Sequence, residues 1–506
     1  MKSNFRNAVY NAIGFVFPVL IGLFTTPYIV HKLNTEVYGI YALAISLMGL
    51  LSFLDLGFGQ GIIKFVSHYE ARNDYKRINE IINTSLFINI VMGVVGFFII
   101  FLLSEFLSLR VFKVRAEYLS LSETALKIVS VGFFLNIVSS TFSNIPRALQ
   151  RYDISVKIQN VIWFCSVMSS LILLYFGYGL VEMLLFYVLF QFIGIILYSH
   201  FSRNLLPSLK LTPSFKKDVF KEIFGFSIYT SINAITGNIV FRVDKMIISY
   251  FLGTSAVTYY QIPFMLSQMA NGFTSSVIQF LMPVVSFINS AGDKEKLKDV
   301  YVRYTRYVFT ISIVVLSGLV LLGKPFLFLW IGKDITGKSY PLLVIISVVF
   351  FFVSISNIGY YIYNGLGKAR INMVSSFIGA IAYLLSALVL VSKYGLIGAA
   401  FAFSFILVPY PVYIYVLNRI LDVSLKWYVN LLSKTLLLIL GMLLIIYALV
   451  YNNFSLKFLT LSGLLLFIIF VSLLFIFSFI SKQDVENLKN RVRKYENRNS
   501  YYSISG

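Results

Sequence analysis

Long apolar runs dominate this sequence and restrict what it can fold into. Runs of about 20 residues with few charges recur along most of the chain, and a helix of that length crosses roughly 30 Å of hydrocarbon. Strands of a membrane barrel would alternate apolar and polar residues, and these runs do not. With 58% hydrophobic and 12% charged residues, the chain has too little polar surface for a soluble fold. We therefore predict an all-α integral membrane protein.

The apolar runs number about fourteen, each long enough for one transmembrane helix. They lie at roughly 7–31, 37–62, 80–104, 123–146, 156–176, 179–201, 220–248, 256–285, 304–324, 340–364, 371–391, 396–418, 430–451 and 457–480.

The chain also contains its own duplicate. The segment LNTEVYGIY, which begins at Leu33, matches LGTSAVTYY from Leu252, and this offset of 219 residues holds until Asp74 meets Asp293. A second pair, IPRALQRYDIS and IYNGLGKARIN, repeats at nearly the same spacing. So long a period indicates two homologous halves, which in membrane proteins usually enclose a pathway.

The duplication divides the predicted helices into groups of six, six and two. We expect an N-terminal six-helix bundle at 1–205 and a C-terminal six-helix bundle at 206–422. Two additional transmembrane helices would follow at 423–480, and a basic tail at 481–506 would be cytoplasmic.

Charge predicts the orientation of the chain in the membrane. With the N-terminus inside, the ends and even-numbered loops hold about 30 of the 42 Lys and Arg residues, against about nine on the other side. Both termini are therefore predicted to be cytoplasmic. The net charge of +21 reflects this topology, and we expect no nucleic-acid partner.

The sequence lacks the residues that several kinds of functional site require. The single cysteine, Cys165, excludes an internal disulfide, and the three histidines lie too far apart in sequence to suggest a metal site. No GxxxxGK[ST] loop is present, and the short outer loops carry no close pair of carboxylates. We expect a transporter without a bound cofactor rather than an enzyme.

Four predicted helices gather polar residues on one face, which should therefore face something wet. The seventh aligns Ser227, Ser231, Asn238, Arg242 and Lys245, and the eighth aligns Gln261, Gln268, Asn271, Ser275 and Gln279. The fourth aligns Asn136, Ser140, Ser143 and Arg147, and the tenth aligns Ser354, Asn357, Tyr361 and Asn364. Gln279 falls over Gln60 at the 219-residue offset. These faces predict a central cavity between the two bundles.

Arg242 and Lys245 lie on one face as like charges, so they need an anion. Asp244 points roughly 100° away on the helix and cannot serve both. The partner would be a carboxylate on another helix, with Asp55 and Glu182 as candidates, or an anionic substrate. Arg and Lys together suit a pyrophosphate. The alternative is that both side chains reach the membrane interface by snorkelling.

Asp55 is an intramembrane carboxylate in the segment FLDLGFGQG. It is a candidate for proton or sodium coupling, or for a structural bond to a neighbouring helix. The small residues Gly57, Gly59 and Gly61 permit close helix approach or a local break. Arg147 ends the fourth helix on the cytoplasmic side, where topology explains it; alternatively it catches an entering phosphate.

The segments VDKMIISYFLGTSAVTYYQI and LDLGFGQGIIKF, with the RALQRYDI and NGLGKARI turns, resemble bacterial O-antigen flippases of the Wzx type. These form the polysaccharide transporter branch of the MATE-like superfamily, and the resemblance covers about residues 5–480. It implies two six-helix bundles in a V plus two extra helices. It also implies that family members depend on cationic cavity residues, a requirement that Arg242 and Lys245 fit, although neither is assigned to an individual family position.

The function implied by the resemblance is movement of an undecaprenyl-pyrophosphate-linked oligosaccharide across the bacterial cytoplasmic (inner) membrane by alternating access. Membrane lipids, a polysaccharide polymerase and a chain-length regulator would be partners, and H⁺ or Na⁺ would be the coupling ion. One alternative is a cation-coupled multidrug antiporter, whose organic cations a cationic cavity would repel. Another is a membrane polymerase or ligase of lipid-linked glycans.

Overall fold

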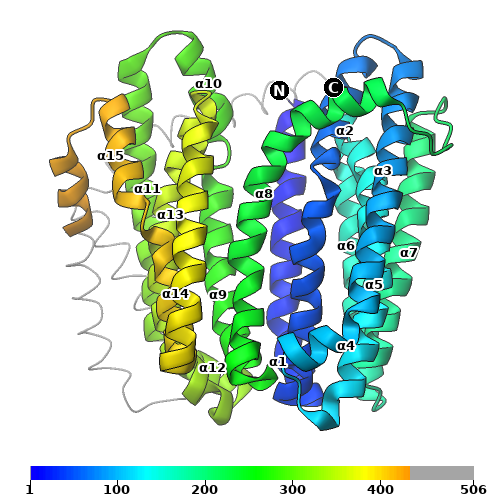
Figure 1. Ribbon diagram of the computed structural model, residues 1–506. Coiled ribbons are helices and arrows are strands. Elements are labelled where there is room, and N and C mark those ends of the chain that lie inside the picture. Colours follow the sequence, from blue (N-terminus) through cyan, green and yellow to red (C-terminus); the bar gives the residue numbers. More distant parts are fainter. Residues whose placement is uncertain (1, 434–506) are drawn as a thin grey trace, which may run out of the picture. The chain divides into compact units, whose positions relative to one another are not determined.

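The computed structural model describes the backbone of residues 2–433, and all of their side chains except those of residues 2–13, 15, 226, 228–235, 238 and 239. Within this part the chain is helical and contains no strand (Figure 1). The last predicted span, the basic tail and most of the predicted span at 430–451 lie outside the described residues.

The helices follow one another with short connections. They are α1 (Lys2–Leu51), η1 (Ser52–Asp55), α2 (Phe58–Glu70), α3 (Tyr75–Leu102), α4 (Ser104–Phe106), η2 (Leu107–Val111), η3 (Ala116–Tyr118), α5 (Leu119–Ala148), α6 (Tyr152–Tyr175), α7 (Leu180–Leu205), α8 (Lys217–Leu252), α9 (Thr254–Ile278), α10 (Leu281–Ser290), α11 (Lys294–Leu321), α12 (Gly323–Ile331), α13 (Lys333–Gly365), α14 (Ala369–Phe403), η4 (Ser404–Leu407) and α15 (Tyr410–Ile420).

Nine segments of the described chain are long and apolar enough to cross a membrane, so this is a multi-pass membrane protein. Two of these segments contain more than one predicted helix. The backbone leaves the helical conformation at Asn34 within α1 and at Gly395 within α14. The count of fourteen transmembrane helices stays a prediction.

Three of the predicted spans are broken rather than continuous. The span at 37–62 is interrupted between α1 and α2, because Leu56 (φ 50°) and Gly57 (φ 73°) are left-handed and cannot continue a helix. The span at 256–285 breaks before α10, where Pro283 cannot donate to the carbonyl four residues earlier. The span at 396–418 breaks between α14 and α15, beside Pro409.

The duplication extends to the backbone conformation of the turns. Four pairs of left-handed residues occupy equivalent positions in the two halves. They are Asn34 and Gly253, Asn73 and Gly292, Lys113 and Gly332, and Gln150 and Gly367. The helices that follow the second pair are capped alike: Asp74 accepts from the amide of Arg77 (3.0 Å), and Asp293 accepts from that of Lys296 (2.9 Å). The left-handed break at Leu56 and Gly57 has no such counterpart.

The two copies of the first repeated segment touch one another reciprocally. The hydroxyl of Thr258 donates to the carbonyl of Thr35 (2.6 Å). At the equivalent place, a Cβ added to Gly39 would lie 2.0 Å from the carbonyl oxygen of Thr254. Thr258 and Thr254 are the duplicates of Gly39 and Thr35 at the 219-residue offset. A local pseudo-twofold axis therefore passes between these turns.

Contacts divide the described chain into two compact units. The first contains Met1–Met269, Lys333–Ile346 and Arg370–Tyr410, and the second contains Ala270–Gly332, Ser347–Ala369 and the described residues from Pro411 on. In the first unit α5 packs against α3 and α7, and α6 packs against α1 and α7, as Figure 1 shows. The boundary predicted from the duplication, between residues 205 and 206, stays a prediction.

Each unit has an apolar core. In the first unit, fully buried residues of α2, α3, α5 and α8 form one cluster, with Phe58, Ile81, Ile145 and Ile223 among its members. The second unit has a cluster around Phe309.

Candidate functional site

A polar cavity of about 250 Å³ lies inside the first predicted bundle, between α5, α6 and α7. The polar face predicted on the fourth helix lines it with all four members, Asn136, Ser140, Ser143 and Arg147. The sequence predicts that this face lines a central cavity between the bundles, whereas the structure turns it toward α6 and α7. Rows of hydroxyls and amides in a membrane protein suit a hydrated or sugar-like ligand.

Arg147 lies in this cavity at the end of α5. Its guanidinium donates to the hydroxyl of Ser155 (3.0 Å) and to the side-chain oxygens of Asn144 (3.4 Å) and Gln159 (3.3 Å). Among the described residues no carboxylate pairs with it. By contrast, nearby Arg151 forms an ion pair with Asp153 (3.0 Å). Within the described structure, Arg147 thus holds a positive charge that only neutral groups contact.

Asp55 lies at the break between α1 and α2 and joins the neighbouring helices. The hydroxyl of Ser140 donates to its carboxylate (2.9 Å), and the amide of Gly59 does so at 3.4 Å. Asn89 of α3, which is fully buried, donates to Ser140 (3.1 Å). Because Ser140 also lines the cavity, Asp55 is one hydrogen bond away from it. Glycine permits the close approach here, since a Cβ on Gly59 would lie 2.6 Å from the amide of Asn144.

The second unit repeats this helix junction with neutral groups. Asn271 of α9 accepts hydrogen bonds from Ser354 (2.9 Å) and Asn357 (3.2 Å) of α13, and Asn357 also donates to Ser275 (2.8 Å). At offsets of 219 and 217 residues, Ser275 and Asn357 correspond to Leu56 and Ser140. The polar faces of the eighth and tenth predicted helices therefore face each other, at least at these residues.

Lys245 finds its anion on its own helix. Its ammonium lies 3.3 Å from the carboxylate of Asp244 and donates to the carbonyl of Phe241 (3.0 Å), and Lys245 and Asp244 are only 3% and 1% exposed. The ammonium also lies 4.9 Å from the ring centre of Phe264. Burial contradicts the snorkelling alternative for Lys245, and the ion pair shows that it needs neither substrate nor another helix for neutralisation.

Arg242 differs from Lys245 in its surroundings. It is half-buried, and its guanidinium lies against the backbone of α1, where a Cβ on Gly49 would be 2.6 Å from its Nε. In the described part of the chain it forms no ion pair. Asp244 thus serves one of the two cations.

The remaining predicted residues lie in varied places. Glu182 caps its own helix by accepting from the amide of Gly179 (2.9 Å), so it does not pair with Arg242 or Lys245. Three glutamines, Gln60, Gln268 and Gln279, are exposed. Asn364 is half-buried near the end of α13, and the side chain of Asn238 lies outside the described part.

Sequence reasoning missed two residues of the first-unit site. Asn89 joins Asp55 to the cavity through Ser140, and Gln159 holds Arg147. The available signal for Asn89 was a lone amide deep in an otherwise apolar run, which a membrane interior rarely tolerates without a partner.

Comparison with known proteins places this geometry in context. A family model described as polysaccharide biosynthesis protein matches residues 5–289. The "Putative O-antigen transporter" of Shigella flexneri is 22% identical over 401 residues, covering 79% of this chain and 94% of that protein.

Two groups of solved structures are similar in fold. The lipid II flippase MurJ, in an inward closed conformation, has a TM-score of 0.72 at 14% identity, covering 93% of this chain and 99% of that one. An inward-facing multidrug resistance MATE transporter of the MOP superfamily has a TM-score of 0.66 at 14% identity, covering 80% and 94%. At this identity the likeness concerns the fold alone.

Proposed function

Since the chain belongs to the polysaccharide biosynthesis protein family and has a MATE-like and MurJ-like fold, we propose that it moves a lipid-linked oligosaccharide across the cytoplasmic membrane. The Shigella flexneri relative is named a putative O-antigen transporter, and the MurJ structure is that of a lipid II flippase. The cargo we propose is an undecaprenyl-pyrophosphate-linked polysaccharide repeat unit, with both termini of the protein in the cytoplasm. A polysaccharide polymerase and a chain-length regulator would be its partners.

The charge of Arg147 carries this proposal. Among the described residues, its guanidinium is held by hydroxyl and amide groups alone, in a cavity lined by the same kinds of group. Guanidinium binds phosphate bidentately, and hydroxyls and amides bind sugars. The polyprenyl tail would stay in the lipid while the headgroup occupies polar surface. Arg242, half-buried and without an ion pair in the described residues, is the second cation that we assign to the headgroup path.

Transport would proceed by alternating access of the two predicted bundles. Asp55 is the residue through which H⁺ or Na⁺ would be coupled, because its carboxylate contacts Ser140 of the cavity wall. Neutralising it would weaken the bonds that join the break between α1 and α2 to α5.

Two other functions fit less well. A multidrug antiporter shares the fold, but Arg147 and Arg242 would repel organic cations. A polymerase or ligase of lipid-linked glycans would have to change glycan length in isolated membranes.

We expect Arg147→Ala to reduce oligosaccharide translocation at least tenfold, because a charged hydrogen bond to phosphate contributes about 1.5–3 kcal/mol. Translocation would be measured in proteoliposomes containing a lipid-linked oligosaccharide, as its accessibility to an external glycosidase over time.

The matched control is Arg151→Ala, whose side chain lies four residues away and is paired with Asp153. It should transport like the wild type. Equal translocation by wild type and Arg147→Ala, in protein that is correctly inserted, would refute the proposed role of this cavity.

A further inference from the structure

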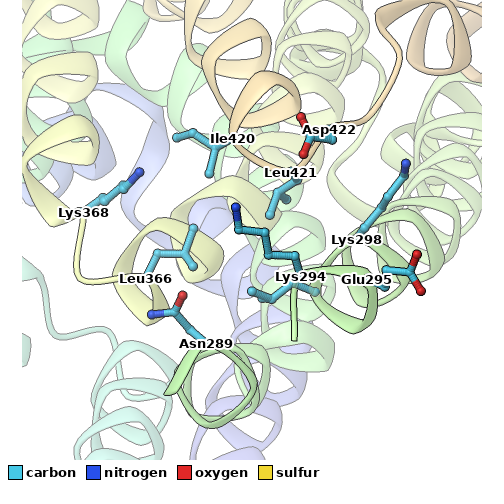
Figure 2. Close-up of a pocket in the computed structure, with 10 residues that line it drawn as sticks. Asn289, Lys294, Glu295, Lys298, Leu366, Lys368, Ile420, Leu421 and Asp422 are labelled. Atoms are coloured by element: carbon cyan, nitrogen blue, oxygen red, sulfur yellow. The ribbon is translucent and has the colours of Figure 1, made fainter. Parts of the chain in front are cut away.

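A second cavity, of about 550 Å³, lies in the second unit where several helices end (Figure 2). Its walls come from the turn between α10 and α11, the turn between α13 and α14, and the end of α15. Leu297 and Leu421, each 5% exposed, contribute apolar surface to its lining, and three lysines line it as well. We call it the lysine pocket, after Lys294, Lys298 and Lys368.

Lysines from two different turns, Lys294 and Lys368, point into the same pocket although their charges repel each other. Figure 2 shows the ammonium groups of Lys294 and Lys368 turned toward the same space, with the amide of Asn289 below them. The carboxylate of Glu295 points away from that space. Within the described residues none of the three lysines forms an ion pair. Three lysines and two carboxylates, those of Glu295 and Asp422, therefore line the pocket, which keeps a net positive charge.

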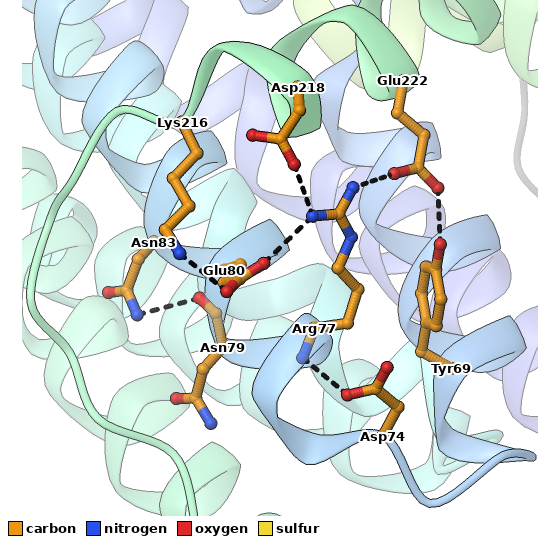
Figure 3. A network of polar contacts seen from close by, with 9 residues as sticks. All are labelled: Tyr69, Asp74, Arg77, Asn79, Glu80, Asn83, Lys216, Asp218 and Glu222. Carbon is orange, nitrogen blue, oxygen red and sulfur yellow. Dashed lines mark hydrogen bonds and ion pairs between the residues drawn. The ribbon is translucent and has the colours of Figure 1, made fainter.

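The equivalent corner of the first half is closed by the chain itself. There Asn79 donates to the carbonyl of Ser208 and accepts from the amide of Lys210, and Asn83 does the same with Lys210 and Thr212, at 2.7–3.0 Å. These bonds hold the linker between the halves on α3, beside the ion-pair network of Figure 3.

In the described part of the chain, the second half lacks this closure. At the 219-residue offset Asn79 becomes Lys298 and Asn83 becomes Val302, so the two amides that hold a passing chain are absent. The chain leaves α15 through Leu421 and Asp422 at the rim of the pocket. Duplication thus produced one corner filled by a linker and one corner that is open and cationic.

We propose that the lysine pocket binds the phosphate of an anionic phospholipid headgroup. The ends of transmembrane helices lie near the headgroup region, and basic pockets between such helices bind lipid phosphates. Lysine ammonium groups would hold the phosphate as point charges, and Asn289 would donate a further hydrogen bond. The apolar surface at Leu297 and Leu421 would receive the first carbons of an acyl chain of the lipid. This inference is independent of the proposed transport activity.

The test uses the purified full-length protein in detergent, with its unfolding temperature measured against added lipid. Phosphatidylglycerol should stabilise the wild type, and phosphatidylcholine, which has no net charge, should not. In Lys294→Ala/Lys368→Ala, the phosphatidylglycerol concentration for half-maximal stabilisation should rise about 30-fold, since each lysine near a lipid surface contributes about fivefold. Without lipid this variant should unfold like the wild type, because both side chains are exposed.

The control is Lys296→Ala, which removes the same charge from the same turn of α11 but does not line the pocket. It should respond to phosphatidylglycerol like the wild type. An equal loss in the control would reduce the effect to surface charge and overturn the proposal. So would stabilisation by inorganic pyrophosphate with none by phosphatidylglycerol, because the ligand would then be a soluble anion.

Discussion

The role of Lys245 can be assigned only once its contacts with Asp244 and other neighbours are known. From the sequence, Lys245 is an intramembrane cation that needs an anionic partner. In the structure it is buried beside Asp244 and over the ring of Phe264. Burying both charges has a large desolvation cost, so neither is tolerated without the other. Their first role is to satisfy each other inside the first unit.

We expect Lys245→Met to destabilise the protein by about 3–5 kcal/mol, because it leaves the Asp244 carboxylate buried without its cation. Lys245→Met/Asp244→Asn should recover most of this loss. Thermal unfolding of the purified variants in detergent measures both effects.

The double variant separates structure from transport. If it unfolds like the wild type and still transports, the ion pair is structural. Equal unfolding temperatures for the single and double variants would contradict the coupling between the two charges.

At the scale of elements, the start of α8 and the linker before it are fastened to α3 by polar contacts. Arg77 forms ion pairs with Glu80, Asp218 and Glu222 at 2.7–3.0 Å, and Lys216 pairs with Glu80 (2.6 Å). The Arg77 guanidinium holds the pKa of Asp218 below its usual value, so this carboxylate remains charged throughout the physiological range. The amides of Asn79 and Asn83 hold the linker itself.

We expect Asn79→Ala/Asn83→Ala to speed hydrogen exchange in the linker at 206–216 by about tenfold or more. The amides of Lys210 and Thr212 would lose their acceptors, each bond being worth roughly 1 kcal/mol. Exchange followed by mass spectrometry measures this.

Asn204→Ala serves as the control, because that side chain is exposed and contacts only His200 of its own helix in the described structure. Its linker should exchange at the wild-type rate. Unchanged exchange in the double variant would show that the ion pairs alone hold the linker.

At the scale of the whole molecule, the duplicated segments that begin at Leu33 and Leu252 contact each other within the first unit. The contact is close because one partner has no side chain: Gly39 lies against the carbonyl of Thr254. Its duplicate Thr258 uses its hydroxyl to bond Thr35 instead. Glu36 adds a bond to the Thr254 hydroxyl and an ion pair with Arg115 (3.2 Å).

We expect Gly39→Ala to destabilise the protein by about 1–3 kcal/mol, because its methyl group forces the two backbones apart. Gly225→Ala is the control, since a Cβ there meets nothing within 4 Å and alanine favours the helix. Thermal unfolding in detergent should distinguish them. Equal unfolding temperatures for the two variants would show that the contact between Gly39 and Thr254 accommodates a methyl group without loss of stability.

The helical membrane class and the repetition of the turns can be inferred from the amino-acid sequence alone. Apolar length is a property of consecutive residues, as is the duplication that places left-handed Gly292 where Asn73 lies and Asp293 where Asp74 lies. Such features depend on local chain chemistry, so they can be read without coordinates.

Which polar groups contact one another depends on tertiary packing and could not be inferred from the sequence. Helical period assigns Ser140 and Arg147 to one face but does not say which helix that face meets, since this depends on how each helix is rotated and packed. The structure turns that face toward α6 and α7 and brings Asp55 to Ser140 at a helix break. It also pairs Lys245 with its sequence neighbour, because side-chain rotation can overcome an angle between Cβ directions.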